Sequence, residues 1–210
     1  MPTRVKICGI TRLEDAQLAV ELGASGLGFN FFRPSPRYLA PEAAREIIGR
    51  LPLFVTAVGV FADEVDGENV ERVARQAGVA VIQLHGPRFP GPSPVLENYP
   101  LIRAVAVKGD FRPADLARLK ANLFLLDTFD AAVPGGTGKI FDWSLAREAK
   151  RYGTIILAGG LTPQNVGEAI RAVRPFAVDV ASGAESAPGR KDPARLRAFF
   201  AVVEEADGAD

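Results

Sequence analysis

Residues 154–165 read Thr-Ile-Ile-Leu-Ala-Gly-Gly-Leu-Thr-Pro-Gln-Asn, and this stretch holds one complete unit of a repeat that runs through the chain. Its first part, Thr154–Ala158, is a short apolar run without polar alternation, which is typical of a parallel strand buried on both faces. Two glycines follow, and then Thr162 and Pro163 mark a helix start, with a capping residue before a proline in the first turn. The stretch therefore predicts a strand, a glycine turn and a helix in that order.

Seven more apolar runs of this kind occur along the chain, separated by amphipathic stretches with similar helix starts at Pro41, Pro113 and Pro193. Eight strand-then-helix units without a break in composition favour a single α/β domain folded as a (β/α)₈ TIM barrel. A doubly wound open sheet is the alternative fold. The eight runs are Val5–Cys8, Gly26–Phe29, Val55–Phe61, Val79–Leu84, Ile102–Val107, Leu123–Asp127, Thr154–Ala158 and Ala177–Ala181.

The barrel is expected to span residues 1–203 as the catalytic domain. The small and acidic residues 204–210 are expected to form a frayed tail. Four prolines between residues 87 and 94 leave little room for a helix after the fourth strand, so the fourth helix is expected to be shortened or irregular.

The composition excludes some classes of protein. Of the 210 residues, 48% are hydrophobic and 24% are charged, and the formal net charge is zero, so the long-range attraction of a general nucleic-acid binder is missing. One cysteine cannot form an internal disulfide. The first residues lack a signal-peptide hydrophobic region, and no apolar run reaches the roughly 18 residues of a membrane span. We therefore expect a cytoplasmic protein that binds neither nucleic acid nor membrane.

Three chemically active side chains stand at the ends of predicted strands. The one cysteine, Cys8, ends the first run, the one histidine, His85, follows the fourth, and Asp127 ends the sixth. In a TIM barrel the active site lies at the carboxyl ends of the strands. The positions therefore predict an active site that contains a thiol and a carboxyl group.

The two groups suit proton transfer. A thiol has a reference pKa of ~8.5, so a positive environment gives Cys8 a thiolate base near neutral pH. Lys6 shares its face only if the strand stays regular. Burial after an apolar strand raises a carboxyl pKa, which suits Asp127 as a general acid. The alternatives are a buried structural cysteine and a carboxylate that caps the turn at Thr128.

Glycine-containing turns after the last strands are the candidate phosphate site. Gly159-Gly160-Leu161 follows the seventh run and Ser182-Gly183-Ala184-Glu185 follows the eighth. In TIM barrels these two loops often bind phosphate through backbone N–H groups.

Two further loops carry candidate functional residues. Gly136 lies in the glycine-rich stretch 135–138 after the sixth run, which is either an ordinary loop or a lid over the substrate. Arg37 lies in a proline-stiffened loop after the second run, and its guanidinium group could hold a carboxylate by two parallel hydrogen bonds.

Nine motifs, taken together and in order, resemble the phosphoribosylanthranilate isomerase family over nearly the whole chain. They are Lys6–Thr11, Ser35–Tyr38, Val58–Phe61, Gln83–Gly86, Leu125–Thr128, Gly135–Gly138 with Phe141–Trp143, Leu157–Leu161, Asp179–Glu185 and Lys191–Asp192. The sequence departs from the family at the proline-rich segment after Gly86, where members more often continue into a helix, and at Ala181, where serine is common.

The resemblance implies an intramolecular oxidoreductase of the aldose–ketose type in tryptophan biosynthesis. Its reaction is the Amadori rearrangement of N-(5'-phosphoribosyl)anthranilate to 1-(2-carboxyphenylamino)-1-deoxyribulose 5-phosphate, without a metal or cofactor. Asp127 would protonate the furanose oxygen, and the Cys8 thiolate would remove the proton from C2 of the sugar.

The resemblance also implies roles in substrate binding. Arg37 would hold the anthranilate carboxylate, and Asp179 would reach a sugar hydroxyl. Backbone N–H groups of Gly160, Gly183 and Ala184 would bind the phosphate. His85 and Gly136 would lie near the substrate, with His85 structural or substrate-proximal rather than catalytic.

Other functions remain as alternatives. The first is another phosphate-binding barrel enzyme, such as a sugar-phosphate epimerase or an indole-glycerol-phosphate synthase that uses Lys108. The second is a cysteine hydrolase built on Cys8 and His85. The third is a non-catalytic barrel that binds a metabolite. A related sugar isomerisation in histidine synthesis is a possible second reaction. The expected state is a monomer or a homodimer, in which Phe31 and Phe32 form an interface or cover the substrate.

Overall fold

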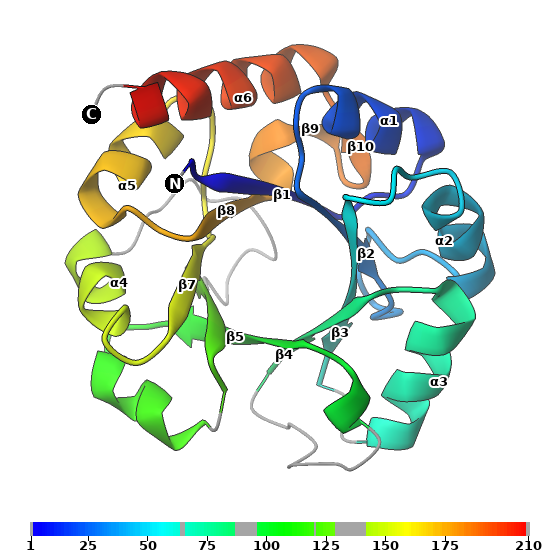
Figure 1. Cartoon of the computed structure of the whole chain (residues 1–210), viewed down its shortest axis with the longest axis horizontal. Coiled ribbons are helices and arrows are strands. Elements are labelled where there is room, and N and C mark those ends of the chain that lie inside the picture. Colours follow the sequence, from blue (N-terminus) through cyan, green and yellow to red (C-terminus); the bar gives the residue numbers. More distant parts are fainter. Residues whose placement is uncertain (1, 64–65, 87–95, 120, 129–141, 209–210) are drawn as a thin grey trace.

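The chain folds as a closed barrel of eight parallel strands inside a ring of helices (Figure 1). The computed structural model describes residues 2–63, 66–86, 96–119, 121–128 and 142–208. The strands are β1 (Arg4–Cys8), β2 (Gly26–Asn30), β3 (Thr56–Ala62), β4 (Val81–His85), β5 (Leu101–Val107), β6 (Leu123–Thr128), β7 (Thr154–Leu157) and β8 (Ala177–Val180). Because β1 pairs with both β2 and β8, the sheet is closed, and the predicted TIM barrel is confirmed.

The helices follow the strands in alternation. They are α1 (Leu13–Glu21), α2 (Pro41–Ile48), α3 (Gly67–Ala77), α4 (Trp143–Ala149), α5 (Val166–Val173) and α6 (Pro193–Gly208). Short 3₁₀ helices are η1 (Leu96–Asn98), η2 (Pro113–Arg118) and η3 (Ser182–Ala184), and a small hairpin joins β9 (Glu185–Ala187) to β10 (Arg190–Lys191). Between β4 and β5 the described residues form only η1, which agrees with the irregular fourth helix expected from the prolines.

Alternation along the strands divides the apolar residues into two cores. A smaller cluster contains Leu125 and Ile156 and fills the inside of the barrel. Neighbouring residues of the same strands, such as Phe124 and Leu157, are fully buried in the larger cluster beneath the helices. Each strand thus places every second side chain inside the barrel, and this alternation decides which residues reach the site.

Two sequence-based expectations differ in part from the structure. The predicted frayed tail continues helix α6 as far as Gly208, because Ala206 is buried and the Asp207 carboxylate accepts hydrogen bonds from the N–H and hydroxyl groups of Thr3 at 2.6 and 2.7 Å. Phe31 is buried and packs against Phe61, with ring centroids 5.3 Å apart, so it does not form an exposed interface.

The large apolar side chains most exposed to solvent lie elsewhere. Among the described residues they are Leu53 and Phe54, 98% and 97% exposed, in the segment before β3. None of the described helices is both long and apolar enough to cross a lipid bilayer.

The ordered end of α6 can be tested by removing its tie to the N-terminal segment. We expect Asp207→Ala to lower the free energy of unfolding by about 1–2 kcal/mol, because two hydrogen bonds to Thr3 are lost. Glu205→Ala, an exposed change on the same turn, is the control and should change it by about 0.5 kcal/mol or less. Urea denaturation measures both. Equal, negligible effects would mean that the helix end does fray.

Candidate active site

The predicted catalytic groups converge on one mouth of the barrel. Cys8 ends β1, His85 ends β4, and Asp127 is the second-last residue of β6, so all three lie at the carboxyl ends of parallel strands. The same two charged residues, Lys6 and Asp179, act electrostatically on each of the three. The structure therefore brings these predicted residues together around one ion pair.

That ion pair is buried inside the barrel. Lys6 and Asp179 are register neighbours on β1 and β8, and the Lys6 Nζ lies 2.6 Å from an oxygen of Asp179, with both side chains less than 10% exposed. Burial alone would lower the pKa of Lys6, but the charges of Asp179 and Cys8 raise it, so the amine stays protonated. Sequence reasoning gave Lys6 no role, although regular alternation on β1 places it on the face of Cys8.

Cys8 combines partial exposure with a charged neighbourhood. Burial is the largest influence on the pKa of its thiol and raises it. The positive charges of Lys6 and Lys191 lower this pKa, and the negative charge of Asp179 raises it. The result is a thiol with a pKa above its ordinary value, so the expectation of a thiol that ionises readily near neutral pH is wrong: burial outweighs the charge of Lys6, which still favours the thiolate. A group of this kind can accept a proton from a bound substrate.

Asp127 has the raised pKa that its position predicts. Burial at the end of β6 raises the pKa of its carboxyl to about 7, and the negative charge of Asp179 contributes in the same direction. The charge of Lys6 opposes both. A carboxyl group that is half protonated near neutral pH can act as a general acid there.

His85 is a neutral side chain in this site. Burial and the charge of Lys6 lower the pKa of the imidazole to about 4. Its Nε2 lies 2.6 Å from the side-chain nitrogen of Gln83, a residue that is 1% exposed on the same strand. The imidazole of His85 thus interacts with Gln83 rather than with the Cys8 thiol. This arrangement disfavours the cysteine hydrolase. Gln83 is a further interior residue that sequence reasoning missed.

Arg37 belongs to a buried cluster of three charges at the rim. Its guanidinium donates from Nη2 to Glu185 at 2.7 Å and from Nε at 3.0 and 3.1 Å. The Lys191 Nζ donates to the same carboxylate at 2.8 Å and to the main-chain oxygen of Cys8. Burial would raise the pKa of Glu185, but the hydrogen bonds and charges of Arg37 and Lys191 lower it. The cluster fixes Arg37 and carries one net positive charge.

Sequence reasoning assigned roles to neither Glu185 nor Lys191, although both lie in motifs shared with the family. The antiparallel hairpin of β9 and β10 explains their proximity, because Lys191 and Glu185 are register partners in it. Such a hairpin has no signal in the strand-then-helix repeat. Lys108, the residue proposed for a synthase, is exposed in the segment after β5.

The two predicted phosphate loops have different local structure. In the first, Gly160 adopts a φ of +65°, and its carbonyl accepts a hydrogen bond from Asn165 at 2.9 Å, which fixes the turn before α5. In the second, Gly183 packs against the main chain of the first loop, and a Cβ there would lie 1.9 Å from the Leu161 carbonyl oxygen. The loops are therefore in direct contact. The Ala184 N–H donates to the Ala181 carbonyl at 3.2 Å.

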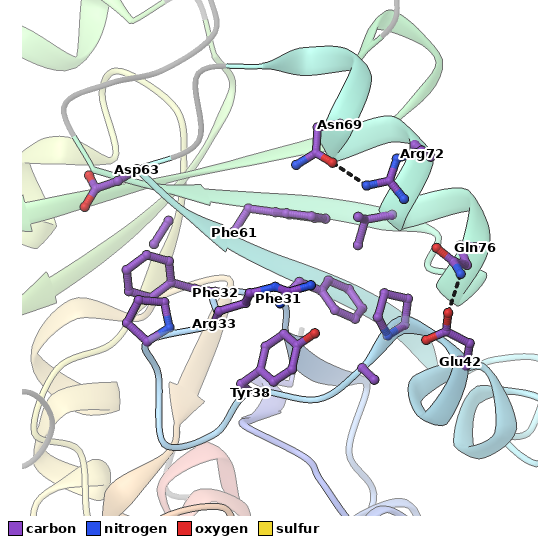
Figure 2. Close-up of a pocket in the computed structure, with 15 residues that line it drawn as sticks. Phe31, Phe32, Arg33, Tyr38, Glu42, Phe61, Asp63, Asn69, Arg72 and Gln76 are labelled. Atoms are coloured by element: carbon purple, nitrogen blue, oxygen red, sulfur yellow. Dashed lines mark hydrogen bonds between the residues drawn. The ribbon is translucent and has the colours of Figure 1, made fainter.

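A separate pocket of about 670 Å³ lies outside the ring of strands, between the segment after β2 and helix α3 (Figure 2). Phe61, on the face of β3 opposite to the barrel interior, lines it together with Phe31, Tyr38 and Arg72. No predicted catalytic residue lines it. The predicted lid residue Gly136 lies outside the residues that the structure describes. Within the described part of the chain, no three His, Cys, Asp or Glu side chains form a group suited to a metal ion.

The raised pKa of Asp127 has a consequence for stability. Its pKa rises from 3.8 unfolded to about 7 folded, so native stability falls as pH rises through that interval, where only the unfolded carboxyl ionises. Asp127→Asn removes this cost, and we expect it to gain stability relative to the parent chain by about 2–4 kcal/mol between pH 4 and pH 8.

Urea denaturation at both pH values measures the difference. The control is Asp142→Asn, since Asp142 caps α4 by accepting from the Ser144 N–H at 2.9 Å and its pKa is lowered by that bond. This variant should lose stability at pH 8 relative to pH 4. A constant difference between Asp127→Asn and the parent chain at all pH values would reject the raised pKa.

Comparison with known proteins agrees with the site. The chain matches the family model of N-(5'phosphoribosyl)anthranilate (PRA) isomerase over residues 5–202. It is 49% identical to the N-(5'-phosphoribosyl)anthranilate isomerase of Citrifermentans bemidjiense, over 95% of this chain and 96% of the relative.

Solved structures give the same result. The phosphoribosyl anthranilate isomerase of Thermus thermophilus superposes with a TM-score of 0.84 at 42% identity, covering 97% of this chain and 99% of that one. A phosphoribosyl anthranilate isomerase in complex with reduced 1-(o-carboxyphenylamino)-1-deoxyribulose 5-phosphate superposes with a TM-score of 0.80 at 40% identity, with the same coverage. The resemblance seen in the motifs is confirmed, and the chain belongs to the phosphoribosylanthranilate isomerase family.

Proposed function

We propose that the chain converts N-(5'-phosphoribosyl)anthranilate into 1-(2-carboxyphenylamino)-1-deoxyribulose 5-phosphate in tryptophan biosynthesis. The observation that carries the proposal is the placement of a thiol and a carboxyl of raised pKa at one mouth of the barrel, around a single ion pair. The reaction requires an acid that acts on the ring oxygen and a base that acts on C2, the two atoms that flank C1 of the sugar. Cys8 and Asp127 supply these two functions.

The first step is ring opening. Asp127, whose pKa is raised to about 7 by burial, donates its proton to the furanose oxygen. The bond from that oxygen to C1 breaks, and the nitrogen lone pair forms the C1–N double bond of an iminium ion. The positive nitrogen then makes the hydrogen on C2 acidic.

The second step is proton removal from C2 by the Cys8 thiolate. The electrons of the C–H bond move toward C1 and neutralise the iminium, giving an enolamine. The enolamine becomes the ketone when the proton held by Cys8 is delivered to C1 and the hydroxyl proton at C2 is returned to Asp127. No net proton is consumed, and both side chains return to their starting states.

Binding groups surround this pair. Arg37 is proposed to hold the anthranilate carboxylate, since its cluster with Glu185 and Lys191 carries one net positive charge to match one negative charge. Backbone N–H groups of Gly160, Gly183 and Ala184 are proposed to bind the phosphate; for Ala184 the hydrogen bond to Ala181 would be shared or exchanged.

Asp179 and His85 are proposed to lie beside the sugar. Asp179 has one carboxylate oxygen engaged by Lys6, which leaves the other as a candidate acceptor for a sugar hydroxyl. His85, neutral at pH 7, is proposed to lie near the substrate without transferring a proton. The cytoplasmic location, and the choice between monomer and homodimer, stay predictions from the sequence.

The acid and base roles predict large and similar losses of turnover. Cys8→Ser and Asp127→Asn should each lower kcat by about 10²–10⁴-fold, while KM changes far less, because each change removes a proton-transfer group. The decay of phosphoribosylanthranilate fluorescence follows the reaction. Leu53→Ser, a change at an exposed residue of the segment before β3, is the control. Parental kcat in either active-site variant would reject its assigned role.

The binding role of Arg37 predicts a different kinetic effect. Arg37→Ala should raise KM by at least about tenfold with a smaller change in kcat, because a charge-assisted pair with the anthranilate carboxylate is lost. The same fluorescence assay measures both constants. Arg33→Ala, a change at an exposed arginine of the same loop, should leave KM near that of the parent chain. An unchanged KM in a folded Arg37→Ala variant would place the carboxylate elsewhere.

A further inference from the structure

The ion pair beneath the catalytic groups has a defined direction. Its positive end, the Lys6 amine, belongs to β1, the strand that carries Cys8 two residues later on the same face. Its negative end, the Asp179 carboxylate, belongs to β8. In the closed sheet β8 is separated from the Asp127 strand, β6, by β7 alone, whereas β1 lies one strand further away. By strand order, the cation thus belongs to the strand of the thiol, and the anion belongs to the strand of the pair that lies nearer to the acid.

The position of Gly28 shows how closely Lys6 and Cys8 approach. Gly28 is the register neighbour of Cys8 on β2, and a Cβ on it would lie 2.9 Å from the Cys8 Sγ and 3.1 Å from the Lys6 Nζ. Both atoms therefore lie within about 6 Å of each other, a distance over which opposite charges change protonation. Glycine at this position leaves room for the two side chains to share one space.

We propose that the buried Lys6–Asp179 ion pair biases the two catalytic residues in opposite directions: its ammonium end favours the thiolate of Cys8, and its carboxylate end favours the protonated form of Asp127. Lys6 and Asp179 are thus positioning residues for the proton transfers, acting through Cys8 and Asp127. The inference deepens the proposed function and rests on the base and acid roles assigned there.

The direction of each influence agrees with this geometry. After burial, the largest influence on the pKa of Cys8 is the charge of Lys6, which lowers it, and Asp179 acts less strongly in the opposite sense. For Asp127 the order is reversed, since after burial the largest influence is Asp179, which raises the pKa, and Lys6 follows. Each catalytic group responds more to the end of the pair that faces it.

Other charges face Cys8 as well, and each is already held by another carboxylate. Lys191 and Arg37 both bind Glu185, and Lys191 also donates to the main-chain oxygen of Cys8. Of the two, Lys191 lowers the pKa of the thiol less than Lys6 does. His85 stands near the ion pair but is neutral at pH 7. Lys6 is therefore the cation whose removal should matter most to the thiol.

The chain offers a direct test because Cys8 is its one cysteine. The rate of alkylation by iodoacetamide between pH 6 and pH 10 reports the thiolate fraction of this residue without substrate. Lys6→Met should slow alkylation at pH 7 by roughly 3- to 10-fold and shift the titration to higher pH, and Asp179→Asn should speed it by a similar factor and shift it to lower pH.

Two further variants keep the test decisive. Lys6→Arg retains the charge and should restore most of the parental alkylation rate, even if Lys6→Met does not fold. Lys150→Met removes a lysine whose amine binds main-chain oxygens of Val173 and Arg174, and it should alkylate as the parent chain does. Shifts in the same direction for Lys6→Met and Asp179→Asn, or no shift in either, would overturn the proposal.

The acid end is tested in the same variants. Carboxyl ¹³C resonances should show Asp127 titrating at lower pH in Asp179→Asn and at higher pH in Lys6→Met, because each variant removes one charge of the pair. In Lys6→Arg, which keeps the charge, Asp127 should titrate near the parental pH. An unchanged Asp127 titration in Asp179→Asn overturns this half of the proposal. Because neither measurement uses substrate, its failure is separable from failure of the proposed function. Opposite alkylation shifts without isomerase turnover would reject the function alone, and turnover without such shifts would reject the role of the ion pair.

Discussion

Closure of the sheet between β1 and β8 is the constraint on which the site depends. That pairing places Lys6 opposite Asp179 in register, and alternation on β1 then places Cys8 on the same inner face. Burying an isolated amine or carboxylate in the barrel would be costly, whereas the pair at 2.6 Å satisfies both. The pairing of β1 with β8 that closes the barrel therefore also places a buried ion pair next to the proposed catalytic residues.

The site also depends on a second charged cluster at the rim. Glu185 binds both Arg37 and Lys191, so its carboxylate joins the segment after β2 to the hairpin after β8. Lys191 extends this link to the end of β1 by donating to the main-chain oxygen of Cys8. One cluster thus orients Arg37, the proposed partner of the anthranilate carboxylate, and supports the strand that carries the proposed base.

Much of this could be predicted from the sequence, because the repeat of apolar run, glycine turn and helix start is local. The runs that end at Cys8 and Asp127 predicted two strands and, through the geometry of the barrel, two side chains at one mouth. Lys6 could have been predicted from alternation alone. The Glu185 cluster could not, since it depends on a hairpin that lies outside the repeat. The helical end at Asp207 was missed because its partner, Thr3, lies at the far end of the chain.

The measurement that tests the central claim most directly is a crystal structure of the chain with reduced 1-(o-carboxyphenylamino)-1-deoxyribulose 5-phosphate. The account predicts the Cys8 sulfur about 3–3.5 Å from C2 of the ligand, with the Asp127 carboxyl facing it across the chain of the sugar. The phosphate should lie between the turns at Gly160 and Gly183. A ligand bound in the pocket beside Phe61, or one whose C2 lies beyond reach of the thiol, would contradict it.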